Sequence, residues 1–165
     1  MVAGALEQLV LDTLYFNRTN SGNTCLVTNV AGQELQEHSE PALSVIERVV
    51  DEVVRPVFSA AYEELYEEVP GLPGVYCHHP FNGLDDLLGA YLLIGSKYDV
   101  ARVIRFLRTL PTALQAEAVA VVPVFFGKRK IPDKELVSFI SELLDSKDPV
   151  LREKAERAIT FLQTP

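Results

Sequence analysis

The local cluster of residue types that commonly bind metals is Cys77-His78-His79, followed by Pro80. A thiolate and an imidazole are typical zinc ligands, and His38 or an acidic residue would have to complete the set. A nucleophilic thiol would instead need a base brought near by the fold. Adjacent side chains rarely chelate one ion together, so the pattern favours an ordinary loop. A metal, small-ligand or catalytic site is the alternative.

A second cluster combines glutamates and tyrosines at helical spacing: Tyr62, Glu63, Glu64, Tyr66, Glu67 and Glu68. Side chains three or four residues apart share a helix face, so these carboxylates would repel one another. The next basic residue after Arg55 is Lys97, so nothing nearby in the sequence neutralises them. The cluster predicts a solvated helix face, a hard-cation site or a contact for a basic partner. No Glu-x-x-His accompanies it, which argues against a di-iron bundle.

Three arginines, Arg102, Arg105 and Arg108, recur at steps of three opposite an apolar stripe. Such a basic strip can face an acidic partner, the acidic helix of the same chain, or solvent. The chain contains no P-loop, GxGxxG, GxSxG, HExxH or EF-hand pattern. The sequence therefore predicts no catalytic residues and no cofactor, and it favours a binding protein over an enzyme.

Composition and charge restrict the class of protein. The 165 residues are 48% hydrophobic and 23% charged, with a net charge of −8 and two cysteines. These values predict one globular domain over 1–165, without a disulfide framework. Neither a signal peptide nor an apolar run of about 18 residues is found, so we expect a cytoplasmic protein that does not enter membranes. The negative charge argues against general binding to nucleic acid.

The acidic charge is concentrated between residues 34 and 68, which hold ten acidic and two basic side chains. The apolar periodicity of this part predicts a long acidic helix over 39–69, kinked or broken at Pro56. The first 38 residues are less regular. Residues 3–16 fit a helix, although Thr13–Val27 could also form a hairpin.

The second half of the chain reads as a series of amphipathic helices over 84–164, after a loop at 70–82. Asn82 and Asp99 are candidate N-caps, and Pro132-Asp133 and Asp148-Pro149 mark the starts of two further helices. Glycine, proline and polar residues predict breaks near 95–98, 111, 127–132 and 145–148.

The run Glu142–Ala155 resembles the turn and second helix of a HEAT or armadillo-type repeat. In that family an Asp/Pro turn precedes a valine, an arginine and an alanine-rich helix. The corresponding residues here are Asp148, Pro149, Val150 and Arg152. Ser96–Arg102 repeats part of the pattern fifty residues earlier. The resemblance implies stacked antiparallel helix pairs, an α-solenoid, in which Arg152 contacts an acid or a carbonyl of the turn.

These observations together predict an all-α protein, HEAT-like over 84–162, that acts as a non-catalytic interaction module. The HEAT resemblance implies an adaptor or regulator. The expected partner is another protein with a basic surface, bound by the acidic helix or by a helical groove. Self-association through Val119–Phe126 is a further option.

Overall fold

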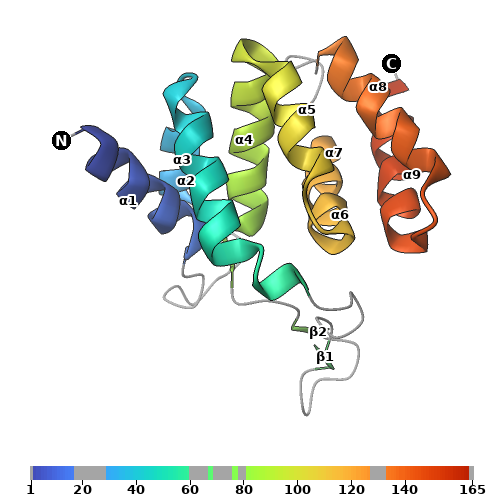
Figure 1. The fold of residues 1–165 in the computed structure, drawn as a ribbon, viewed down its shortest axis with the longest axis horizontal. Helices are drawn as coiled ribbons and strands as arrows, with labels where there is room; N and C mark the ends of the chain where they lie inside the picture. Colours follow the sequence, from blue (N-terminus) through green and yellow to red (C-terminus); the bar gives the residue numbers. More distant parts are fainter. Residues whose placement is uncertain are drawn as a thin grey trace.

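The computed structural model describes residues 2–16, 29–59, 67–68, 76–77, 81–126 and 133–163, and it shows an all-α protein (Figure 1). The α-helices follow in chain order: α1 (Val2–Leu14), α2 (Val30–Gln36), α3 (Pro41–Val49), α4 (Leu84–Tyr98), α5 (Val100–Arg108), α6 (Thr112–Ala120), α7 (Val122–Phe125), α8 (Lys134–Glu142) and α9 (Pro149–Gln163). A π-helical turn (Val50–Val54) and short 3-10 turns (Val57–Ser59, Leu143–Asp145) extend α3 and α8.

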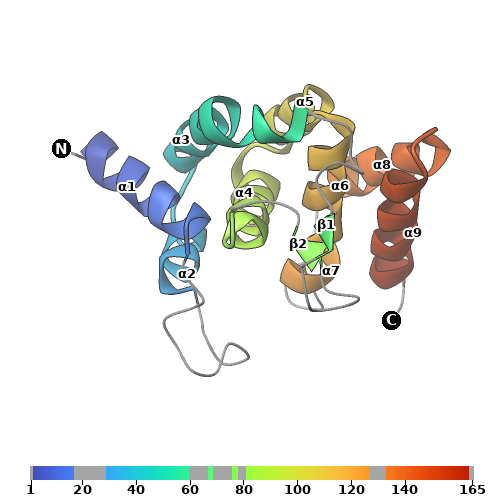
Figure 2. The same cartoon turned by 90° about the horizontal axis from the view of Figure 1, so that it is seen from below.

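The helices form an elongated row, with α1 and α9 at its opposite ends (Figure 1). Figure 2 shows α3 and α5 along one side of the row and α2 and α7 along the other, with α4 between them. Helix α4 contacts α2, α3, α5 and α6, while α5 contacts α8 and α6 contacts α9. Helix α4 therefore has neighbours from both earlier and later parts of the chain.

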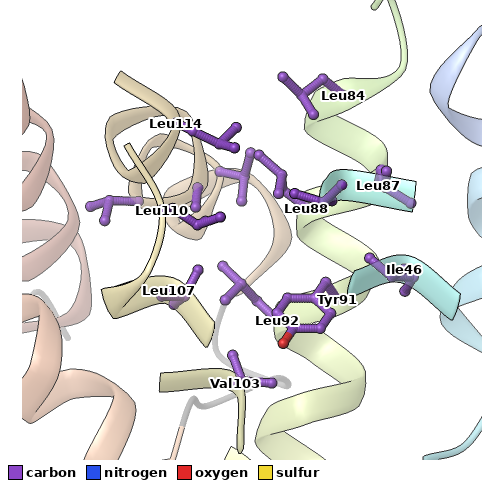
Figure 3. Close-up of a cluster of buried hydrophobic side chains, with 14 of the residues drawn as sticks. Ile46, Leu84, Leu87, Leu88, Tyr91, Leu92, Val103, Leu107, Leu110 and Leu114 are labelled. Atoms are coloured by element: carbon purple, nitrogen blue, oxygen red, sulfur yellow. The ribbon is translucent and has the colours of Figure 1, made fainter. Parts of the chain in front are cut away.

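Helix α4 is the centre of the core. Its sequence is apolar on nearly every side, which is typical of a helix surrounded by others. Leu88 and Tyr91 are each 1% exposed, and Leu87 is fully buried. In Figure 3, Ile46 of α3 lies on one side of α4, and Leu107 of α5 lies on another.

The break predicted near 95–98 lies at Asp99, because α4 continues without interruption to Tyr98. Gly95 is required for packing and does not end the helix. A Cβ atom at this position would collide with the side chain of Val103 in α5. The predicted breaks at 111 and 145–148 are confirmed, whereas 127–132 lies outside the described residues.

The predicted acidic helix over 39–69 is broken at Pro56, as expected, but it does not extend to Glu67–Glu68, and 60–66 lies outside the described residues. Helix α3 widens into the π-helical turn, where the Arg55 amide donates to the Val50 carbonyl at 2.8 Å. Pro56 follows and ends the helix, because its ring cannot fit beside the preceding turn. Glu67–Glu68 is a short strand, β1, paired antiparallel with β2 (Tyr76–Cys77), so Glu67 lies opposite Cys77.

The N-terminal region begins with the predicted helix, α1, while 17–28 lies outside the described residues. Asn29 then fixes three elements together. Its side-chain oxygen accepts the Gly32 amide at the start of α2. Its amide nitrogen donates to the Thr13 carbonyl and to the Asp86 carboxylate, each at 3.0 Å. This buried asparagine thus joins the end of α1 to the starts of α2 and α4.

The segment Val119–Phe126, considered above for self-association, contributes mainly to the core of its own chain. Val119, Val122 and Phe126 are each at most 3% exposed, whereas Val124 is 77% exposed. Val119 belongs to α6 and Val122 to α7, and the short α7 packs against α4, α6 and α9. None of the helices in the described part of the chain is both long enough and apolar enough to cross a bilayer.

Candidate functional site

A surface groove lies between α5 and α8, with a volume of about 530 Å³. Ile104 of α5 and Phe139 of α8 supply apolar side chains to its lining. Three basic side chains also line it, Arg105 and Arg108 from α5 and Lys134 from α8, together with the acidic Glu135 and Glu142 of α8. Apolar surface beside exposed cations suits an acidic segment of a protein better than it suits a reaction centre.

The helix repeat places these side chains on one face. Ile104 and Arg105 lie four and three residues before Arg108 in α5, so all three can line the side that faces α8. The N-cap of α5 is Asp99, as predicted, because its side chain accepts the Arg102 amide at 3.2 Å. Asp133, predicted to lie at the start of a helix, caps α8 by accepting the Glu135 amide. The two caps fix where both walls of the groove begin.

The structure separates the three arginines of the predicted basic strip. Arg102 turns toward α3 and binds Glu47, which belongs to the acidic part of the chain. Arg108 pairs with Glu142 at 3.1 Å, and its guanidinium lies 5.1 Å from the centre of the Phe139 ring. Arg105 is exposed and has no ion-pair partner among the residues that the structure describes. Only Arg105 and Arg108 therefore belong to the groove.

Arg102 is held in a partly buried network. Its Nε and Nη2 atoms donate to both oxygens of Glu47, at 2.9 to 3.2 Å, and the Tyr91 hydroxyl donates to the same carboxylate at 2.6 Å. Arg102 also donates to the Ser44 hydroxyl. The bonds from Arg102 to Glu47 raise the pKa of the guanidinium. Burial and then the bond to Glu47 raise the pKa of Tyr91 well above its usual value. This network joins α3, α4 and α5 and is structural.

The turn that resembles a HEAT repeat is held by its own polar groups. Asp148 accepts the backbone amides of Val150 and Leu151, each at 2.9 Å, and Pro149 is the first residue of α9. Arg152 donates to the Ser146 carbonyl at 3.1 Å, which is the kind of contact that the resemblance implied. The Arg152 side chain is exposed, so this bond contributes at most about 1 kcal/mol.

The two other predicted clusters fall mostly outside the described residues. This is so for Tyr62, Glu63, Glu64, Tyr66, His78 and His79. Glu67, Glu68 and Cys77 are described only as strand backbone, so the expected helical spacing does not hold at the two glutamates. Within the described ranges, no three histidine, cysteine or acidic side chains are grouped so as to hold a metal ion.

Sequence reasoning missed Lys134 and Phe139, which complete the groove. The alternation of apolar and charged residues in α8 indicated that both residues lie on a helix. It did not show that this helix packs against α5. Comparison of the chain with protein-family models, curated proteins and solved structures finds no match.

Proposed function

We propose that this chain is a non-catalytic protein–protein interaction module, an adaptor or regulator, that binds an acidic segment of a partner in the groove between α5 and α8. The observation that carries this proposal is that Arg105 and Lys134 are exposed in the groove and have no ion-pair partner among the described residues. They lie beside the partly exposed side chain of Ile104. A partner that supplies carboxylates and an apolar side chain would neutralise the two cations and cover Ile104.

The HEAT-like arrangement belongs to the same proposal. Its support is that α5 contacts α8 while α6 contacts α9, as two successive antiparallel helix pairs would. Gln115 of α6 donates to the Leu107 carbonyl of α5 at 2.8 Å, which joins the first pair. Grooves between neighbouring pairs are extended binding surfaces in stacked helical repeats.

Charge reversal in the groove tests the proposal. The variant Arg105→Glu/Lys134→Glu is compared with Arg157→Glu/Lys147→Glu, which makes the same change of net charge at exposed positions outside the groove. Partners are captured from the native host with the wild-type chain, purified, and titrated against each variant by calorimetry. We expect the groove pair to weaken binding by tenfold or more and the control pair by less than about threefold.

Two outcomes would overturn the proposal. One is a purified partner that binds both variants equally well. The other is a rise in melting temperature on addition of Zn²⁺ that disappears when His78 and His79 are replaced by alanine. That result would instead support the alternative of a metal or small-ligand site at Cys77-His78-His79.

A further inference from the structure

A second groove lies at the opposite end of the row, between α1 and the segment that joins α2 to α3. Its volume is about 580 Å³. Leu6 and Leu9 of α1 and Pro41 at the start of α3 provide apolar surface. Asp12 of α1 and Glu34 of α2 add two carboxylates to the lining. The groove is thus apolar and acidic at once.

The negative charge of this groove has no internal compensation among the described residues. No lysine or arginine lines it, and His38 is the sole side chain of the lining able to carry positive charge. Arg48 of α3 is already paired with Glu7 at 3.1 Å. Asp12 accepts a neutral hydrogen bond from the Gln8 amide at 2.8 Å, which leaves its charge in place. A cationic ligand would therefore find two exposed carboxylates that no described base neutralises.

Both ends of the row expose apolar as well as charged side chains. At one end, α9 exposes Glu153, Glu156 and Arg157 and also Phe161, at 37%. At the other end, α1 leaves Ala5 exposed and Leu9 partly exposed beside the groove. No described helix lies beyond it (Figure 1).

We propose that this acidic groove is a second docking site, for a basic segment of another protein that carries apolar side chains. Lysines or arginines of the segment would pair with Asp12 and Glu34, and its apolar side chains would cover Ala5 and Leu9. A nucleic acid would be repelled by the same carboxylates. The inference deepens the proposed function and rests on it, because grooves of opposite charge at the two ends allow one chain to bridge two partners.

A basic peptide tests the site directly. The probe is a fluorescent amphipathic helix of roughly 18 residues with lysine on one face and leucine on the other. Its binding is measured by fluorescence anisotropy against the full chain and two variants. Asp12→Lys/Glu34→Lys reverses the groove charges. Asp145→Lys/Glu156→Lys changes the same residue types at exposed positions far along the chain, with the same change of net charge.

We expect the groove pair to lower the affinity for the probe by about tenfold and the control pair by less than about threefold. Equal losses would show attraction to total charge alone and would overturn the proposal. The proposal would also be overturned if the wild-type chain self-associates in analytical sedimentation and Asp12→Lys/Glu34→Lys abolishes that association. The groove would then be occupied by a second copy of the chain. The variant Arg105→Glu/Lys134→Glu should bind this probe as the wild-type chain does. The proposal for the α5–α8 groove is tested separately, with the acidic partner, so either proposal can fail without the other.

Discussion

Replacing Arg102 with alanine should destabilise the protein more than any comparable change on α5. The guanidinium is 25% exposed and the Glu47 side chain 17% exposed, so solvent screens the pair only in part. Removing Arg102 takes away bonds to both oxygens of Glu47 and leaves that carboxylate with Tyr91 as its remaining described partner. Charge-assisted bonds to a partly buried group contribute about 1.5–3 kcal/mol.

After a discount for the exposed quarter of the guanidinium, we expect a loss of about 2 kcal/mol. In a chain of this size each kcal/mol corresponds to roughly 2–4 °C, so the melting temperature should fall by about 4–8 °C. Calorimetry or circular dichroism measures this directly. Arg105→Ala is the matched control, because Arg105 occupies the same helix one turn later without an ion-pair partner among the described residues. Its effect should stay within about 0.5 kcal/mol.

A double-mutant cycle with Glu47→Gln separates the pair from the general effect of truncation. We expect a coupling energy of about 1–2 kcal/mol between the two positions. Arg102→Lys should recover only part of the stability, since an ammonium cannot reproduce the two-oxygen contact. The reasoning is refuted if Arg102→Ala and Arg105→Ala lower the melting temperature equally, or if the cycle is additive.

The network also predicts alkaline behaviour. Burial and a carboxylate partner raise the pKa of Tyr91 above 10, so the folded chain keeps a proton that the unfolded chain loses. Its contribution to stability is therefore complete below pH 10 and falls by up to about 1.4 kcal/mol per pH unit above it. Tyr91→Phe should flatten this slope in urea unfolding between about pH 9 and 11, and an unchanged slope would contradict the assignment. Gly83→Ala should destabilise the protein by more than about 2 kcal/mol in thermal melts, because a Cβ atom would collide with the Thr13 carbonyl. Gly4→Ala is the control: a Cβ atom there has no neighbouring atom within 4 Å, so this variant should be neutral or stabilising. Asp148→Ala removes the N-cap of α9 and should cost about 1 kcal/mol by denaturant titration, and no measurable loss would argue against the cap.

The sequence was sufficient where the information is local. The side chains of Asp99, Asp133 and Asp148 reach amides two or three residues further on, so each cap could be recognised without knowing the fold. The apolar stripe of α4 likewise predicts a helix with one face in the core, and the structure buries most of its residues. The all-α class followed from many such local signals.

Features that depend on partners distant in the chain were decided by tertiary structure alone. Arg102, Arg105 and Arg108 look equivalent in sequence, yet Arg102 binds α3, Arg108 pairs with α8, and Arg105 has no ion-pair partner in the described part of the chain. Gly95 is a residue type that commonly ends helices, but α5 packs so closely against it that a glycine is needed within α4. The two grooves arise in the same way, because each is formed by helices whose proximity no local pattern encodes. Periodicity tells which face of a helix is buried; only packing tells what it is buried against.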